Sequence, residues 1–192
     1  MNIKLSLKDK RSIDKETLMN GLFAGASVLA AGSILLYTKN DLQHLDFILR
    51  PVSSLVYWTT GSASSYLEET GYVHETLGIS IGASCSGIHF LTVLFLMLVF
   101  NFISKVKGLY HKIATFIIFG ILAICITILA NASRILVSVL VLSLPPFSTS
   151  GQGPLIHLAI GVLFYFSYLL LTYSLASAIY LNKGAHSYET SV

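Results

Sequence analysis

The stretch that decides the fold class is 113–133, IATFIIFGILAICITILANAS, in which no residue carries a formal charge. After Arg134, the 48 residues 135–182 again contain no Asp, Glu, Lys or Arg. Charged residues make up only 11% of the chain, against about a quarter in an ordinary soluble domain. A bilayer core requires about 20 apolar residues for each helix that crosses it. The sequence therefore predicts an integral membrane protein rather than a water-soluble globule.

Four segments have the length and composition of transmembrane helices, namely 18–37, 86–103, 113–130 and 155–179. Basic residues precede the first segment, as they precede a signal peptide. Its 20-residue length and the lack of a clear cleavage site favour a retained anchor instead. We predict a single membrane domain of the all-α class over 1–192, a bundle of four or more transmembrane helices.

Lysine and arginine residues are distributed unevenly around these segments. Nine lie in the N-terminal tail 1–17, the loop 105–112 and the C-terminal tail, and three (Lys39, Arg50 and Arg134) lie on the opposite side. Because basic residues favour the cytoplasmic side of a membrane, we expect both termini in the cytoplasm. The net charge of +3 does not indicate a nucleic-acid partner, since the basic residues stand at the ends of apolar runs.

The outer loop 38–84 is long enough to be structured. Its apolar part, 47–58, ends on Tyr57 and Trp58, which is typical of an interfacial segment at the level of the lipid headgroups. Residues 73–83 alternate between apolar and polar, with the period of a β-strand. We expect this strand to be one arm of a small hairpin leading into the second helix.

Residues 135–144 are apolar but too few to span a bilayer, and Pro145-Pro146 follows them. This segment either prolongs the third helix beyond the membrane or folds back along the outer interface.

The polar residues of the helices fall at one depth, at the outer ends of three of them. Cys85 stands at the start of the second helix, Asn131 and Arg134 at the outer end of the third, and His157 at the outer start of the fourth. Ionisable groups at the edge of a spanning bundle are costly to desolvate and are therefore functional candidates. A thiol at a helix N-terminus also has its thiolate stabilised by free N–H groups.

Each candidate has a simpler alternative. Cys85 is also compatible with a small buried apolar residue, Arg134 with a headgroup contact, and His157 with an interfacial cap. Asn131 precedes Arg134 by three residues and shares its helix face, which favours a polar cluster. Cys125, deeper in the third helix, is predicted to serve packing, and His74 is predicted to face solvent or the interface.

A metal site is the less favoured interpretation of this cluster. His89 follows Cys85 by four residues on the expected helix, so that the two residues and His157 would supply three ligands. The spanning helices carry no acidic ligand, and the chain has no Cys-x-x-Cys pair. We therefore expect neither a metal nor another cofactor.

Three motifs occur in order at the outer ends of successive helices: SCSGI at 84–88, NASRI at 131–135 and HLAIG at 157–161. In these motifs the chain resembles the exosortase/archaeosortase family over about 42–173. Its short length and the lead-in GYVHE at 71–75 resemble the exosortase K type. Members of this family are membrane-embedded cysteine transpeptidases that process secreted proteins bearing a C-terminal sorting signal, made of a short motif, a hydrophobic helix and a basic tail.

The resemblance implies Cys85 as the nucleophile, Arg134 as its electrostatic partner and His157 as the acid and base. The neighbouring motif residues Asn131, Ser86 and Gly87 would support them. His89 stands where the family frequently has Arg or Asn, so that a share of His89 in the acid–base work stays open. The implied location is the bacterial cytoplasmic (inner) membrane, with the active site on its outer face.

Two rival functions fit parts of the sequence. A non-enzymatic transport or assembly protein would use the Cys, Arg and His cluster only structurally. A transport path requires polar residues near the membrane midplane, where this chain is almost wholly apolar. An outward-facing thiol redox protein would require a second thiol near Cys85, and Cys125 lies too deep. The expected partners are the lipid bilayer, a secreted substrate with a hydrophobic C-terminal tail, and an acceptor of unknown identity.

Overall fold

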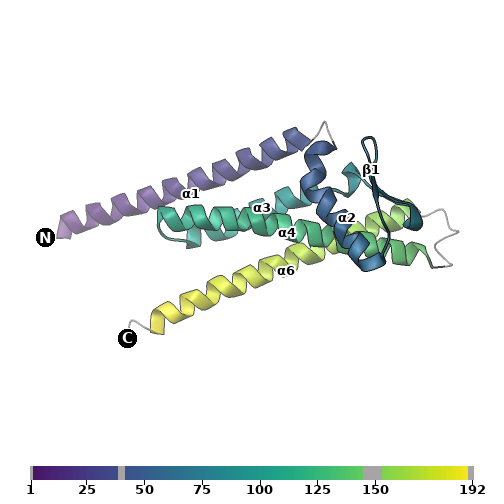
Figure 1. The fold of residues 1–192 in the computed structure, drawn as a ribbon. Coiled ribbons are helices and arrows are strands. Elements are labelled where there is room, and N and C mark those ends of the chain that lie inside the picture. Colours follow the sequence, from purple (N-terminus) through teal and green to yellow (C-terminus); the bar gives the residue numbers. More distant parts are fainter. Residues whose placement is uncertain (1, 39–41, 145–152, 190–192) are drawn as a thin grey trace.

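The computed structural model describes residues 2–38, 42–144 and 153–189. Four helices run side by side along its length: α1 (Asn2–Thr38), α3 (Ile88–Phe102), α4 (Leu109–Leu142) and α6 (Gly153–Glu189) (Figure 1). The two chain ends lie at one end of this bundle, whereas the short helix α2 (Asp46–Thr60) and a small sheet lie at the other. We call the latter the sheet end of the molecule.

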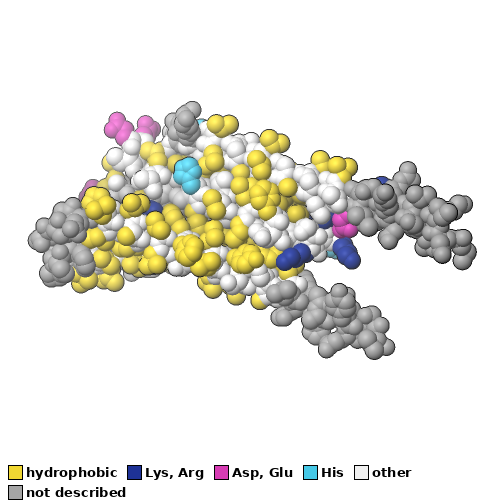
Figure 2. All heavy atoms as spheres, turned by 180° about the vertical axis from the view of Figure 1, so that it is seen from behind, with side chains coloured by type: hydrophobic (Ala, Val, Ile, Leu, Met, Phe, Trp, Pro, Cys, Tyr) yellow, Lys and Arg dark blue, Asp and Glu magenta, His cyan; other side chains and the backbone are white. Residues whose placement is uncertain are grey.

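The prediction of four helices long and apolar enough to span a membrane is confirmed. The spans by length and composition are Lys15–Thr38, Ala83–Lys105, Leu109–Leu142 and Gly153–Tyr180. Seen from behind, apolar side chains cover much of the body, and the most prominent Lys and Arg side chains gather near the end that carries the chain termini (Figure 2). The region predicted as an N-terminal tail, 1–17, is helical from Asn2 onward and continuous with the first span.

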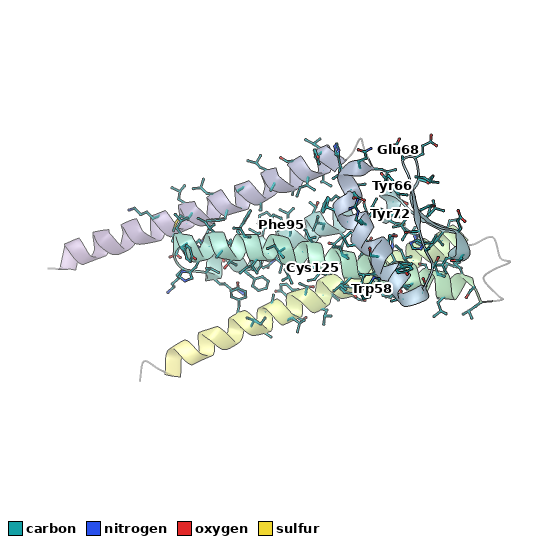
Figure 3. All side chains as sticks on the ribbon, viewed as in Figure 1. Trp58, Tyr66, Glu68, Tyr72, Phe95 and Cys125 are labelled. Carbon is teal, nitrogen blue, oxygen red and sulfur yellow. The ribbon has the colours of Figure 1, made fainter. Side chains whose placement is uncertain are left out.

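Helix α2 corresponds to the predicted interfacial segment. Its buried side chains recur with the period of a helix face: Ile48, Leu49, Val52, Ser53 and Val56. This face packs against α4. On the other side Trp58 is 83% exposed at the end of the helix (Figure 3). The buried face therefore fastens α2 to the bundle, while the aromatic end stays free.

The small hairpin predicted beside the helices is present as part of a sheet of three antiparallel strands: β1 (Ser65–Leu67), β2 (Gly71–His74) and β3 (Ile79–Ile81). In the register, Tyr66 pairs with Tyr72, and Val73 pairs with Ser80. The single strand predicted over 73–83 is wrong. A 3₁₀ turn at Glu75–Leu77, closed by Gly78, folds this run back on itself and makes two strands of it. Alternation persists through a tight turn, so the pattern does not reveal the reversal.

Helix α4 contains both the predicted third helix and the segment 135–144 as far as Leu142. It is one continuous helix of 34 residues, so the first of the two alternatives for 135–144 holds up to that residue. At 1.5 Å per residue the helix is about 51 Å long, against about 30 Å for a hydrocarbon core. The helix is therefore long enough for one end to project beyond a bilayer. Pro145 and Pro146 lie outside the described residues.

Lys112, near the start of α4, is buried although it was counted among the basic residues of the loop 105–112. Its Nζ donates to Asn20 Oδ1 at 2.5 Å and to the backbone oxygen of Ile103 at 3.1 Å. Glu16 lies 4.0 Å away across the same junction. One ammonium group therefore joins α1, the end of α3 and α4.

Replacing Lys112 with Met is expected to lower the thermal unfolding temperature of the purified protein in detergent. Met keeps the volume but removes the ammonium donor. The half-buried Asn20 oxygen then loses its partner, at about 1–3 kcal/mol, while the Ile103 oxygen keeps only the N–H of Val106. Lys107→Met is the matched control, because Lys107 is exposed. Equal unfolding temperatures for the two variants would contradict a structural role of the Lys112 ammonium.

Candidate active site

A cavity of about 510 Å³ opens at the sheet end, between the β2–β3 hairpin and the neighbouring parts of α4 and α6. Cys85 and His157 both line it, together with Ser138 of α4. Its opposite wall is the hairpin segment 77–81. We call this space the thiol cavity. The structure thus brings together two of the three predicted catalytic residues, although 71 residues of sequence separate them.

The imidazole of His157 is held by α4. Its Nδ1 shares a hydrogen bond of 3.1 Å with Ser138 Oγ, and Ser138 is buried. This bond fixes the plane of the ring and occupies one of its nitrogens. The other nitrogen, Nε2, is thereby left for exchange of a proton in the cavity.

Cys85 does not occupy the helix N-terminus predicted for it. It lies in a 3₁₀ turn, Ala83–Cys85, and α3 begins only at Ile88. Its own N–H donates to the backbone oxygen of Gly82 at 2.9 Å, so this N–H is not a free helix-end donor. Cys85 is 7% exposed, and its Sγ shares a hydrogen bond of 3.9 Å with Ser84 Oγ. The predicted placement of the Cys85 thiol at the first turn of a helix is therefore wrong.

Gly87 is the residue that separates Cys85 from the start of α3. Its φ of +63° lies in the left-handed region, which turns the backbone between Cys85 and the first turn of α3. A Cβ at this position would stand 2.6 Å from Asn131 Nδ2. Gly87 therefore serves both the turn and the close approach of α4.

Asn131 fastens that turn to the bundle. Its Nδ2 donates to the backbone oxygen of Ser86 at 2.7 Å, and its Oδ1 accepts a hydrogen bond from the Tyr165 hydroxyl. The Tyr165 ring stacks on Phe90 of α3, with centroids 4.7 Å apart. One buried amide thus connects the turn that carries Cys85 with α4 and α6. Asn131, Ser86 and Gly87 are thus in mutual contact, and their supporting role in catalysis stays a prediction.

Arg134 lines a second cavity, of about 540 Å³, between α3 and α6. We call it the arginine cavity; Ser84 lines both cavities. The side chain is only 6% exposed, and its Nε and Nη2 atoms are buried without a hydrogen-bond partner among the described residues. Its guanidinium carbon lies 5.3 Å from the centre of the Tyr165 ring. Arg134 therefore stands beside the thiol cavity with a charge that no described carboxylate balances.

His89 is exposed and lines the arginine cavity, away from the thiol cavity. The prediction that His89 and Cys85 share a helix face is wrong, because the left-handed Gly87 between them interrupts the helix. In the part of the chain that the structure describes, no three His, Cys, Asp or Glu side chains form a group that could hold a metal ion.

Two cysteine and histidine predictions are corrected. Cys125 does not serve packing; it is exposed on α4, away from the sheet end (Figure 3). His74 does not face solvent; it is fully buried between β2 and α2, with Nε2 3.0 Å from Ser53 Oγ and Nδ1 2.9 Å from the backbone oxygen of Ser62. It therefore fastens the wall of the thiol cavity to α2.

Two site residues were missed in the sequence. Ser138 follows Arg134 by four residues on the same face of α4, and this spacing was the available signal. Tyr165 follows His157 by eight residues on α6, but an aromatic residue in an apolar helix carries no distinguishing pattern. Only the tertiary structure shows its contacts with Asn131 and Arg134.

A separate polar group lies at the protein surface where α2 meets β2. Arg50 Nη2 is 2.8 Å from Asp46 Oδ2, and the Tyr72 hydroxyl donates to Asp46 Oδ1 at 2.6 Å. Burial, together with the hydrogen bond to Asp46, raises the pKa of Tyr72 above its ordinary value. The group joins the sheet to α2 and lies apart from Cys85, since neither cavity of the candidate site includes its members.

Comparison of the chain with protein-family models, with curated proteins and with solved structures finds no match.

Proposed function

We propose that the protein is a membrane-embedded cysteine peptidase or transpeptidase that cleaves a C-terminal sorting signal from secreted proteins at the outer membrane surface. The observation that carries this proposal is the shared thiol cavity of Cys85 and His157, in which Ser138 orients the imidazole. A buried thiol, an oriented base and a neighbouring buried guanidinium are the parts that acyl transfer through cysteine requires. The motifs that resemble the exosortase/archaeosortase family contain all three residues.

The first chemical step forms a thioester. Nε2 of His157 takes the Cys85 proton, and the thiolate attacks the carbonyl carbon of the scissile peptide bond. Negative charge then develops on the carbonyl oxygen, and the guanidinium of Arg134 stabilises it. His157 returns the proton to the departing nitrogen, so that the C–N bond breaks and the hydrophobic tail leaves with a free amine.

The second step releases the product. An amine or hydroxyl acceptor, or water, attacks the thioester carbonyl while His157 accepts its proton, and Cys85 recovers its own proton from the imidazolium. Transfer to an acceptor gives transpeptidation, and transfer to water gives hydrolysis. The same three side chains serve both outcomes.

In this proposal the protein is a multi-pass protein of the bacterial cytoplasmic membrane, with both termini in the cytoplasm and the sheet end outside. The nine-to-three distribution of basic residues supports this orientation. Four spans bring the two termini to the same side, as in Figure 1. The outer surface would then carry the exposed end of α2 and the sheet.

The orientation predicts which engineered cysteines an impermeant maleimide labels in intact cells. Because Cys85 is itself buried, the reporters are Glu68→Cys at the sheet end and Lys107→Cys at the opposite end, both at exposed positions. Both are introduced into a chain that lacks Cys85 and Cys125. Glu68→Cys should react in intact cells, and Lys107→Cys only after permeabilisation. The reverse pattern would invert the topology and move the site to the cytoplasm.

The activity is tested by co-expression with a secreted reporter that ends in a hydrophobic helix and a basic tail. We expect the reporter to lose this tail only when the chain is present, which mass spectrometry of the mature reporter detects. A matched reporter with a charged residue in the middle of its hydrophobic helix should not be processed. Identical reporter masses with and without the chain, across reporters that differ in the motif before the helix, would favour the non-enzymatic alternative.

A further inference from the structure

The arginine cavity has a composition that the proposed reaction does not explain. It lies between α3 and α6, and most of its lining is apolar: Val93, Val162, Phe166 and Leu169 stand on membrane-spanning segments. Arg134 and His89 are the basic side chains in its lining. The cavity thus combines an apolar lining with a cationic group.

The buried positive charge of Arg134 would be stabilised by a bound anion. Its Nε and Nη2 atoms are buried and have no acceptor among the described residues, and none of the salt bridges in that part of the chain involves it. The Tyr165 ring contributes a cation–π contact, with its centre 5.3 Å from the guanidinium carbon. Five N–H donors in a planar fork match the oxygens of a phosphate group. A buried guanidinium left without an acceptor is unfavourable, so a ligand that supplies one gains binding energy.

We propose that the arginine cavity binds one phospholipid of the surrounding membrane, with the phosphate on Arg134 and an acyl chain along Val93, Phe166 and Leu169. Charge complementarity selects a phosphate, and the apolar lining selects a molecule that carries hydrocarbon beside it. Inorganic phosphate satisfies only the first condition. Diacylglycerol, which lacks the phosphate, satisfies only the second.

This inference goes beyond the proposed reaction and does not depend on it. Cys85 does not line the arginine cavity. Where both proposals hold, the lipid phosphate binds the guanidinium of Arg134 in the substrate-free protein. During the reaction the carbonyl oxygen of the substrate replaces the phosphate. The lipid site is therefore tested on a chain that carries out no chemistry.

The experiment uses full-length Cys85→Ala protein, purified in an uncharged detergent and titrated with short-chain phosphatidylglycerol. Native mass spectrometry counts the bound lipids. We expect one saturable lipid per chain, no comparable complex with diacylglycerol, and no competition from inorganic phosphate at tenfold excess. Arg134→Gln should weaken lipid binding at least tenfold, whereas Arg50→Gln, at an exposed arginine of α2, should not change it.

A second variant keeps the test valid if Arg134→Gln fails to fold. Val162→Phe adds volume to the exposed apolar lining and leaves Arg134 in place, so it should also weaken lipid binding. Thermal unfolding checks that each variant is folded. Unchanged lipid binding in Val162→Phe, or equal retention of diacylglycerol, would overturn the lipid proposal. Displacement of the lipid by inorganic phosphate would instead identify a simple anion site and would equally overturn it.

Discussion

Cys85→Ala is expected to abolish removal of the hydrophobic tail from a co-expressed reporter, while the protein accumulates normally in the membrane. The substitution removes the nucleophile, and the thiol cavity holds no second thiol that replaces it. Its effect on stability should be small compared with the roughly 2–5 kcal/mol of a buried Leu→Ala, because a single sulfur atom leaves little empty volume. Processing is measured by reporter mass, and accumulation by immunoblot of membrane fractions.

Cys125→Ala is the matched control for this experiment. It removes the other thiol of the chain, which is exposed on α4 away from the sheet end. We expect full processing by this variant. If Cys85→Ala processes the reporter normally while His157→Ala does not, the chemistry is centred on histidine and the thioester mechanism is wrong.

Gly87→Ala is expected to destabilise the protein and to abolish processing, although it adds only a methyl group. The left-handed backbone costs a residue with a Cβ about 1–2 kcal/mol. The new Cβ also meets Asn131 Nδ2 at 2.6 Å and must displace it. Loss of the bond from Asn131 to the Ser86 carbonyl adds about 1–3 kcal/mol for unpaired buried groups. Chemical denaturation in mixed micelles measures the sum.

Gly61→Ala separates these two contributions. Gly61 has a φ of +73°, but a Cβ there meets no atom within 4 Å. This variant therefore carries only the backbone strain, and it lies outside the candidate site. We expect it to process the reporter normally and to lose less stability than Gly87→Ala. Equal losses in the two variants would show that the contact between Gly87 and Asn131 has no energetic role.

The spanning helices could be predicted because each depends on local composition alone. About 20 apolar residues without a charge have few other stable arrangements, and the observed spans contain all four predicted segments. Residues 86, 87 and 103 of the second segment lie outside α3 itself. The same count of residues per span places three residues near one end of the bundle, namely Cys85, Arg134 and His157. The chain order of the helices was therefore enough to place these residues at a common depth.

The finer arrangement of the site depends on contacts that no local pattern encodes. The left-handed backbone of Gly87 places Cys85 outside α3. The need for glycine at this position comes from Asn131, which occupies the space that a Cβ would fill and belongs to a distant part of the sequence. The burial of His74, on strand β2, depends on its contact with Ser53 of helix α2. The assignment of Arg134 to a cavity other than that of Cys85 likewise requires the packing of α3, α4 and α6.

The two charged residues of α4 are separated by about the thickness of a hydrocarbon core. Lys112 is fixed at one end of the bundle, and Arg134 follows it by 22 residues, which is about 33 Å of helix. That length is close to the roughly 30 Å of a hydrocarbon core. In the proposed orientation, a thicker membrane would draw Arg134 into hydrocarbon, and a thinner one would lift the thiol cavity away from the lipid surface. Hydrophobic mismatch, set by the acyl chains of the host membrane, would then govern how high above the bilayer a substrate must present its scissile bond.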